Sequence, residues 1–264
     1  MKAAVNGVQL AYQDEGLGLP LVFVHGFPFD RRVWQGQVEA FKADHRVLVP
    51  DLRGFGESGS PAGLVTMAQY AEDLRELLVL RHTGPVVLIG HSMGGYVALA
   101  FARHHPELVR GLVLVATKAS ADSPTAAAGR RTLADKALGE GPEAVVDAMA
   151  PRMLAPSRRD PALEARVRAL MTPLDPQGAA GALLGMAERP DATPYLAQMT
   201  VPALVVAGAE DILIPPEESQ KLARGIPGAH LAVLPQAGHL VSLEQPEGFN
   251  QALTTWLAQF SPSA

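Results

Sequence analysis

Hydrophobic positions along the chain follow two patterns that alternate. Short apolar runs, several of them continuous, are typical of strands buried on both faces of a parallel sheet. Such runs occur at residues 8–12, 21–24, 47–49, 86–89, 112–115, 203–207 and 231–234. Segments with helical spacing lie between them, at residues 34–43, 67–80, 93–105, 217–224 and 246–260, and glycines and prolines mark the joins. The pattern therefore predicts an α/β fold, with a mostly parallel central sheet and helices on both of its faces.

The alternation breaks between residues 118 and 199. This stretch has no convincing strand and is rich in Ala, Leu, Met and Arg, and its pattern predicts short helices at 126–138, 142–154, 161–171 and 177–187. A chain of 264 residues is long enough for one domain with a sizeable core and an insertion. We therefore expect residues 1–117 and 200–264 to form the core and residues 118–199 to form an inserted helical cap.

Composition narrows the functional class. The chain has 22 basic and 27 acidic side chains, and its net charge of −5 argues against nucleic-acid binding through a basic surface. It has no Cys, which excludes a disulfide framework, a thiolate metal site and a cysteine nucleophile. No His-Glu-x-x-His pattern occurs, and we expect no metal or other cofactor. Because neither a signal-peptide pattern nor an apolar run of roughly 20 residues is present, we expect a cytoplasmic monomer or homodimer without membrane partners.

One motif has a strong chemical meaning, Gly90-His91-Ser92-Met93-Gly94. A predicted strand ends at this motif and a predicted helix begins at Met93, which is the context of a nucleophile elbow. Such a turn holds the serine at strained backbone angles, and a side chain at position 90 or 94 would collide with it. We therefore predict that Ser92 is a nucleophile, with the positive end of the helix beside its hydroxyl.

A serine hydroxyl needs a base to remove its proton, and the base needs an acid to orient it. His239 lies in the loop after the last predicted strand, and Asp211 follows the strand at 203–207. Both therefore lie at the carboxyl ends of strands, where ligands bind in open α/β sheets. We predict that His239 is the base and Asp211 the acid. His25 is predicted to be a buried hydrogen-bonding residue, and His91 to lie behind the catalytic groups.

Acyl transfer also needs donors that stabilise an oxyanion. The segment His25-Gly26-Phe27-Pro28 leaves the strand at 21–24, so the backbone N–H of Phe27 is one candidate. The N–H of Met93, the residue after the nucleophile, is the second. Gly26 is expected to permit a close approach of the backbone to the site.

Together these segments resemble the α/β-hydrolase superfamily over essentially the full length of the chain. The resemblance rests on residues 25–28, the run from Asp51 to Ser58, residues 90–95, Asp211 and the Gly238-His239 pair, with Ser, Asp and His in the family's chain order. Residues 94–102 and 185–190 are similar to small bacterial carboxylesterases, a branch that also resembles 3-oxoadipate enol-lactonases and cofactor-free haloperoxidases (perhydrolases). Haloalkane dehalogenases and epoxide hydrolases of this fold use an aspartate nucleophile, whereas position 92 is Ser. The run from Asp51 to Ser58 is expected to shape a loop and to take no part in the chemistry.

The residues and the resemblance together imply a carboxylesterase that cleaves short-to-medium acyl esters through an acyl-enzyme on Ser92. We expect an apolar substrate pocket under the cap, lined by Met149, Met153, Leu154, Leu183, Leu184 and Met186. One alternative is hydrolysis of a lactone or enol-lactone, in which Arg130, Arg131, Arg152 or Arg158 would hold a substrate carboxylate. A second is perhydrolysis, with peroxide in place of water. A third, a non-catalytic binding protein on a hydrolase fold, is disfavoured because all three predicted catalytic residues are present.

Overall fold

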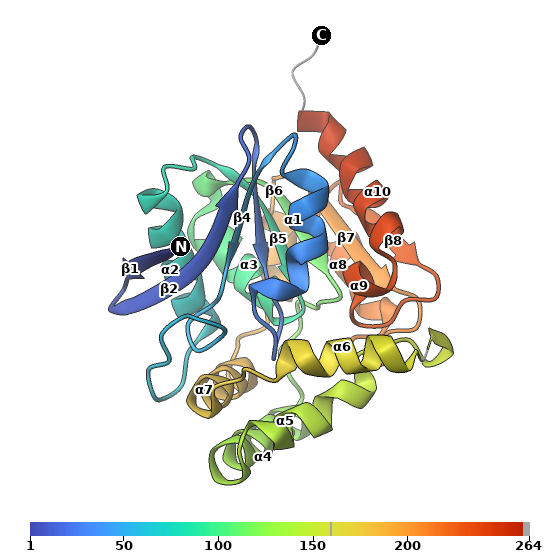
Figure 1. Cartoon of the computed structure of the whole chain (residues 1–264). Helices are drawn as coiled ribbons and strands as arrows, with labels where there is room; N and C mark the ends of the chain where they lie inside the picture. The colour runs from blue at the N-terminus through green and yellow to red at the C-terminus, as the bar shows by residue number, and fades with distance from the viewer. Residues whose placement is uncertain (159, 261–264) are drawn as a thin grey trace.

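Eight strands form a single sheet in the computed structural model, which describes residues 1–158 and 160–260 of the chain. The strands are β1 (Lys2–Val5), β2 (Val8–Glu15), β3 (Pro20–Val24), β4 (Arg46–Pro50), β5 (Val86–His91), β6 (Val109–Val115), β7 (Ala203–Gly208) and β8 (His230–Leu234). Their order is β1-β2-β4-β3-β5-β6-β7-β8, in which β2 is antiparallel to both neighbours and the other pairs are parallel (Figure 1). The loop after β5 therefore opens where three neighbouring parallel strands end.

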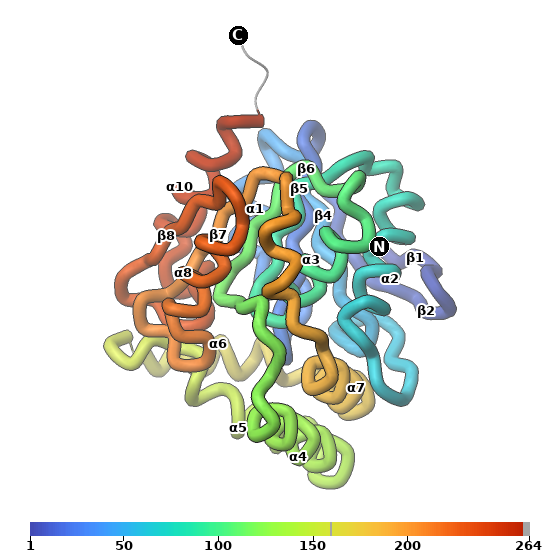
Figure 2. Tube along the Cα trace, turned by 180° about the vertical axis from the view of Figure 1, so that it is seen from behind, coloured from blue at the N-terminus to red at the C-terminus, as the bar shows by residue number. Residues whose placement is uncertain are grey.

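Helices cover both faces of this sheet, as the alternating pattern predicts. The face toward the viewer in Figure 1 carries α1 (Gln35–Phe41), α9 (Val241–Glu244) and α10 (Pro246–Leu257). The face seen in Figure 2 carries α2 (Met67–Leu80), α3 (Met93–His104) and α8 (Pro216–Gly225). Every residue of β5 and β7 is buried, which explains why these strands are continuous apolar runs. Alternate strand residues contribute to two hydrophobic clusters, one on each side of the sheet.

A helical region is inserted between β6 and β7. It contains α4 (Pro124–Glu140), α5 (Pro142–Met149), α6 (Pro161–Met171) and α7 (Pro176–Ala187), which lie together at the bottom of Figure 1. Each of these helices begins with a proline, whose missing N–H needs no partner at that position. The side chains of Ser123, Asp160 and Asp175 cap α4, α6 and α7 by accepting N–H groups of the first turn.

The helix α7 lies very close to the loop that follows β4. A Cβ on Gly178 would collide with the carbonyl oxygen of Gly54, and one on Gly185 would collide with that of Val65. Between these two contacts, the N–H of Val65 donates to the carbonyl of Gly181 at 3.1 Å. Because the three glycines of α7 are spaced along one face of the helix, a larger residue there would push the inserted region away from the core.

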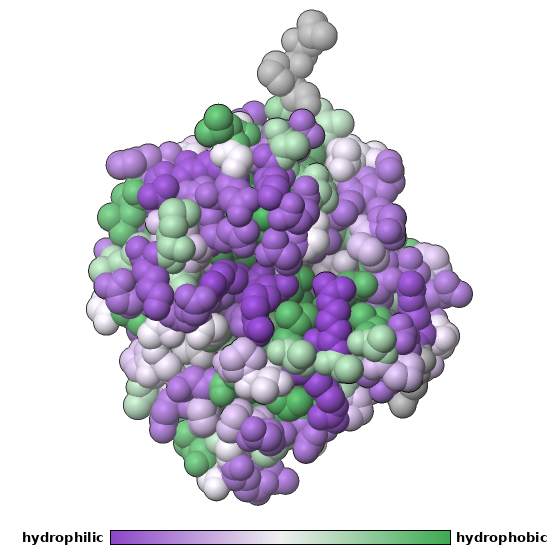
Figure 3. All heavy atoms as spheres, in the orientation of Figure 1, coloured by the Kyte–Doolittle hydropathy of each residue, from purple (hydrophilic) through white to green (hydrophobic). Residues whose placement is uncertain are grey.

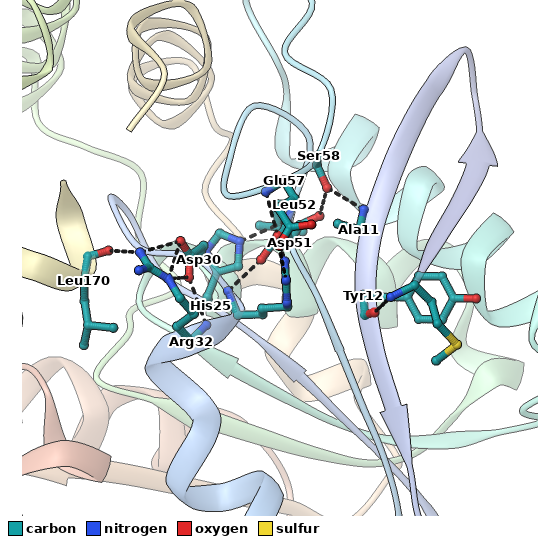
Figure 4. Close-up of polar contacts among 12 residues, drawn as sticks. Ala11, Tyr12, His25, Asp30, Arg32, Asp51, Leu52, Glu57, Ser58 and Leu170 are labelled. Atoms are coloured by element: carbon teal, nitrogen blue, oxygen red, sulfur yellow. Dashed lines mark hydrogen bonds and ion pairs between the residues drawn. The ribbon is translucent and has the colours of Figure 1, made fainter. Parts of the chain in front are cut away.

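The loops after β3 and β4 are bonded to each other beside the sheet (Figure 4). The Nε2 atom of His25 accepts the N–H of Leu52 at 2.9 Å, and the carboxylate of Asp51 accepts the N–H of Glu57 at 2.9 Å. The hydroxyl of Ser58 donates to the carbonyl of Asp51 at 2.7 Å. His25 is thus a buried hydrogen-bonding residue, and the run from Asp51 to Ser58 shapes the loop.

The loop after β3 also holds the inserted region. Arg32 donates from Nη2 to the carbonyl of Leu170, near the end of α6, at 3.1 Å (Figure 4). The carboxylate of Asp30 orients this guanidinium through contacts of 2.8 and 3.0 Å to Nε. The inserted region is therefore bound to core loops through both α6 and α7.

Three elements differ from the predicted ones. β1 has no predicted counterpart, because its residues lie at the sheet edge and only Val5 is buried. The helix predicted at 142–154 ends at Met149, since Pro151 cannot donate a helical hydrogen bond, and a 3₁₀ turn follows at Ala150–Arg152. The helix predicted at 246–260 becomes a 3₁₀ turn after Leu257.

The surface seen in Figure 3 is mostly hydrophilic, and its hydrophobic residues are scattered in small groups. The exposed large hydrophobic side chains include Leu17, the adjacent Val79 and Leu80, and Leu231 and Val233 on the edge strand β8, so they form only small groups. In the part of the chain that the structure describes, no helix combines the length and the hydrophobicity that crossing a membrane requires.

Candidate active site

Ser92 lies between the end of β5 and the start of α3. Its backbone angles are φ 52° and ψ −114°, in the positive-φ region that non-glycine residues rarely occupy. A Cβ on Gly90 would collide with the carbonyl oxygen of Gly94, and a Cβ on Gly94 would collide with that of Val24. Glycine is required at the first position by the tight turn and at the second by the close packing of α3 on β3. This is the strand–turn–helix geometry of a nucleophile elbow.

Three polar side chains from distant parts of the chain meet at the carboxyl end of the sheet. The Nε2 atom of His239 lies 2.9 Å from Oγ of Ser92, and its Nδ1 atom lies 2.8 Å from Oδ2 of Asp211. Ser92 follows β5, Asp211 follows β7 and His239 follows β8, so each side chain lies at the end of a different strand. His239 is 2% exposed and Asp211 is 4% exposed, so water is kept from the bond that joins them.

The carboxylate of Asp211 is also held by its own loop. Its Oδ1 atom accepts the N–H of Leu213 at 2.8 Å and that of Ile214 at 3.0 Å. Burial opposes ionisation, but the charge and the hydrogen bond of His239 and the two backbone donors leave the pKa of Asp211 below its ordinary value. An ionised Asp211 favours the tautomer of His239 that carries its hydrogen on Nδ1, so Nε2 is free to accept a proton from Ser92.

A second histidine lies against the first. The ring centroids of His91 and His239 are 4.9 Å apart, and Nε2 of His91 lies 2.9 Å from the backbone carbonyl of His239. Burial, together with the nearby His239, lowers the pKa of His91 to about 3. The ring of His91 is therefore neutral and donates from Nε2 to the carbonyl. It supports the backbone of His239 from behind.

The loop after β3 lies against the nucleophile. A Cβ on Gly26 would lie 3.0 Å from Cβ of Ser92 and 2.6 Å from Nδ1 of His91, so only glycine allows this approach. Phe27, the next residue, lines the same cavity as Ser92. Within residues 1–158 and 160–260, the backbone N–H groups of Phe27 and Met93 have no hydrogen-bond acceptor. Both groups are therefore free to donate to a ligand.

A buried carboxylate behind the catalytic loop was not predicted. Glu244 is 1% exposed and accepts the N–H of Gly238 at 2.8 Å and that of Ala155 at 2.7 Å. The N–H of His239 donates in turn to the carbonyl of Met153 at 3.1 Å. Burial raises the pKa of Glu244. These bonds join the inserted region to the loop that carries the histidine, and no local sequence pattern indicates a contact between segments so far apart.

A cavity of about 450 Å³ opens beside Ser92, between the core and the inserted region. Among the described residues, no group of three or more His, Cys, Asp or Glu side chains could hold a metal ion there or elsewhere. The core contributes Phe27, Ser92, Tyr96, Leu213, Ile214 and His239 to the cavity wall, and the residues from 118 onward contribute Lys118, Asp122, Ala126, Gly129, Arg130, Leu133, Met149, Arg152, Leu183 and Met186.

Half of the six residues predicted to line the substrate pocket lie elsewhere. Met153 and Leu154 are buried in the hydrophobic cluster that also contains Leu240, because the backbone bonds of this segment direct it against the histidine loop. Leu184 packs against the cluster on the other side of the sheet. Tyr96 lines the cavity and was missed, although its position one helical turn after Ser92 places it there. Those of the six that line the cavity are Met149, Leu183 and Met186.

The cavity wall has an excess of positive charge. Lys118, Arg130 and Arg152 line it, and Asp122 is the one carboxylate among its described lining residues. Asp122 pairs with Arg130, with Lys118 at 3.3 Å and with Arg189 at 2.9 Å. Burial alone would raise the pKa of Asp122, but the hydrogen bonds from Arg189 and Arg130 hold it well below its usual range. Asp122 is thus ionised and pairs with three cations. Since Lys118, Arg130 and Arg152 line the wall with this one carboxylate, the wall keeps a net positive charge.

Comparison with known proteins decides the family. The model of the alpha/beta hydrolase fold family matches residues 20–246. The chain belongs to this family. The structure of this α/β-hydrolase is similar to that of a thermophilic esterase from Thermogutta terrifontis with malate bound, at 45% identity and a TM-score of 0.93, covering 98% of this chain and 96% of that one. The match makes the chain an esterase-like hydrolase and confirms the predicted fold and superfamily.

Two further relatives of this α/β-hydrolase differ from each other in the substrates that their names give. The enol-lactonase from Burkholderia xenovorans LB400 is 30% identical, with a TM-score of 0.90, and covers 98% of this chain and 100% of that one. The pimeloyl-[acyl-carrier protein] methyl ester esterase from Vibrio atlanticus (strain LGP32) is 29% identical over 261 residues, which are 94% of this chain and 97% of that protein. Both names describe hydrolysis of a carboxylic ester bond, open in one and cyclic in the other.

Proposed function

We propose that this α/β-hydrolase is a serine carboxylesterase that cleaves short-to-medium acyl esters through an acyl-enzyme on Ser92. The observation that supports this most strongly is the hydrogen-bonded chain from Ser92 through His239 to Asp211, at the wall of a cavity of about 450 Å³. The similarity to an esterase at 45% identity supports the same reaction class.

In the proposed mechanism, His239 takes the proton of Ser92 as Oγ attacks the ester carbonyl carbon. The N–H groups of Phe27 and Met93 then bind the resulting oxyanion, each donor contributing about 3 kcal/mol of transition-state stabilisation. His239 gives its proton to the departing alcohol, and the acyl group stays on Oγ. A water molecule, deprotonated by the same histidine, attacks the acyl-enzyme, and the acid leaves as Ser92 regains its proton.

Chain length of the substrate gives the direct test. A cavity of about 450 Å³ between the core and the inserted region has room for a short acyl chain, so we expect p-nitrophenyl butyrate to have a kcat/KM about 10²-fold above that of the palmitate ester. Initial rates across a C2–C16 series, measured below the critical micelle concentration of each ester, give the comparison. A preference for C16 over C4 would contradict the proposed substrate class.

The positive cavity wall favours a second candidate, a lactone or ester whose acid part carries a carboxylate. Arg130 and Arg152 line the cavity, whereas Arg131 and Arg158, the other two arginines considered from the sequence, do not. The enol-lactonase at 30% identity and the esterase that binds malate support such a substrate. We propose that Arg130 and Arg152 would meet its carboxylate.

Substitution of Arg152 separates the two candidate functions, hydrolysis of a neutral ester and hydrolysis of a substrate that carries a carboxylate. If the carboxylate binds there, Arg152→Met should lower kcat/KM for a carboxylate-bearing lactone by on the order of 10- to 100-fold and leave that for its methyl ester nearly unchanged. Arg131→Met is the matched control, because its side chain is half-exposed and lies 4.0 Å from Glu188 outside the cavity. An equal loss of kcat/KM in Arg152→Met and Arg131→Met would contradict this second candidate function. So would a loss in Arg152→Met that is equal for the lactone and for the methyl ester.

The pH dependence of the reaction follows from the charges at the site. Protonation of His239 abolishes general-base catalysis, so kcat/KM for a neutral ester should fall as the pH is lowered. Burial lowers the pKa of His25, and burial together with the nearby His239 lowers that of His91 to about 3, so both rings favour the neutral form. We expect the decline to approach a limiting slope of one in a plot of log kcat/KM against pH, because one proton bound to the base is enough to stop catalysis. A slope of two would show that a second group must also be deprotonated.

A further inference from the structure

A second cavity lies beside the catalytic one and takes no part in the proposed mechanism. It has a volume of about 270 Å³ and is formed by the start of α2, the outer part of α3, the end of α7 and the 3₁₀ turn Thr193–Gln198. Its wall is largely apolar and includes Met67, Leu99, Ala100, Ala119 and Met199. A cavity of this kind suits an unbranched hydrocarbon chain, which needs contact area and no hydrogen-bond partner.

The two cavities share two wall residues, Tyr96 and Lys118. Tyr96 is 5% exposed and lies one helical turn after Ser92, so α3 places it in the shared wall close to the reacting group. Lys118, the other shared residue, is held in place by its ion pair with Asp122. Removal of the Tyr96 ring would therefore connect the second cavity to the catalytic one.

The ring of Tyr96 is fixed in place by a clamped arginine. The guanidinium carbon of Arg189 lies 4.0 Å from the ring centroid, a cation–π geometry. Arg189 donates to the carbonyls of Met186 at 2.8 Å and Ser120 at 3.0 Å, and to Asp122 at 2.9 Å. Because Nη1 and Nη2 make these three hydrogen bonds, Arg189 cannot follow a moving ring without losing them. The ring is thus a rigid part of the wall.

We propose that Tyr96 determines the chain-length specificity of the enzyme by closing the catalytic cavity against a second site built for an apolar chain. The inference rests on the proposed esterase function. With Tyr96 present, the acyl chain of a bound ester ends at the ring. With the ring removed, a longer chain continues into the second cavity, where each methylene that leaves water improves binding by about fourfold.

The test compares decanoate and butyrate p-nitrophenyl esters in Tyr96→Ala and wild-type enzyme. We expect the ratio of kcat/KM for C10 over C4 to rise by at least about tenfold in Tyr96→Ala, and to stay near the wild-type value in Tyr96→Phe, which keeps the ring. Leu133→Ala is the matched control, because Leu133 lines only the catalytic cavity and its truncation adds space without opening the wall. Tyr96→Leu is the second variant for the case in which Tyr96→Ala does not fold, and the same direction of change is expected.

A double variant tests where the longer chain lies. Ala100 lines the second cavity alone, and Ala100→Phe fills part of it. Added to Tyr96→Ala, it should return the C10 over C4 ratio toward the wild-type value. An unchanged ratio in Tyr96→Ala and Tyr96→Leu, an equal gain in Leu133→Ala, or a gain that survives Ala100→Phe would each overturn the proposal. A failure of the esterase function itself is distinguished by a wild-type enzyme that neither hydrolyses any ester nor reacts with a fluorophosphonate probe.

Discussion

Ser92→Ala is expected to lower kcat for p-nitrophenyl butyrate by on the order of 10⁶-fold, which is the largest effect of any single substitution in this chain. Without Oγ no acyl-enzyme forms, and His239 and Asp211 then have no nucleophile to activate. The residual rate would come from the oxyanion donors and from substrate binding alone. KM should change little, since the substitution removes one atom, Oγ, from the cavity wall and leaves the other lining residues in place.

Fluorophosphonate labelling and the thermal unfolding midpoint complete this test. The probe should label wild-type enzyme at one site and fail to label Ser92→Ala. The fold should persist, because alanine adopts φ 52° at a cost similar to that of serine, and among the described residues the hydroxyl bonds only to His239. Ser120→Ala, a change of the same chemistry in a residue near the inserted region, should be labelled like wild type. A labelled Ser92→Ala, or one within about tenfold of wild-type kcat, would place the nucleophile elsewhere.

The three candidate catalytic residues could be predicted to be neighbours because each lies in the connection that follows a strand. In a parallel sheet the carboxyl ends of the strands meet at one edge, so residues such as Ser92 and His239, 147 positions apart, become neighbours by topology alone. The Gly-x-Ser-x-Gly motif then identifies one of the three positions independently of the others. Local pattern and strand order thus suffice for this part of the site.

The wall of the cavity could not be predicted in the same way. Met153 and Leu154 have the composition of pocket residues, yet the contact of this segment with the loop of His239 buries them in another cluster. That contact depends on Glu244, a carboxylate from α9 that binds N–H groups of both segments. Such long-range polar contacts leave no periodic pattern in the sequence. The hydrophobic character of the residues was predicted, but not the direction in which they face.

The same limit applies to Tyr96. Its distance of one helical turn from Ser92 is visible in the sequence, but the proposed role as a partition requires two cavities, and each cavity is formed by segments from distant parts of the chain. The clamp by Arg189 adds a third segment, at the end of α7. In the proposed function, specificity depends on how the inserted region rests on the core, whereas the three side chains that carry the chemistry all come from the core.

Asp211→Asn tests the remaining part of the chemistry, and we expect kcat to fall by on the order of 10⁴-fold with little change in KM. The carboxamide oxygen of asparagine would accept the N–H groups of Leu213 and Ile214 as Oδ1 of Asp211 does, and its NH₂ group would then face Nδ1 of His239. To accept that hydrogen bond, His239 must carry its own hydrogen on Nε2, where it faces Oγ of Ser92. In this tautomer the imidazole cannot take the serine proton.

A substitution of the neighbouring carboxylate, Glu210, is the control for this test. Glu210→Gln removes the adjacent carboxylate, which accepts hydrogen bonds from Ser157 and does not touch His239. It should therefore retain kcat close to the wild-type value, whereas Asp211→Asn should react slowly with a fluorophosphonate probe, since nucleophilic attack by Ser92 is impaired at its first step. If Asp211→Asn lost less than about tenfold in kcat, or if Glu210→Gln lost as much, the carboxylate that orients His239 would not be Asp211.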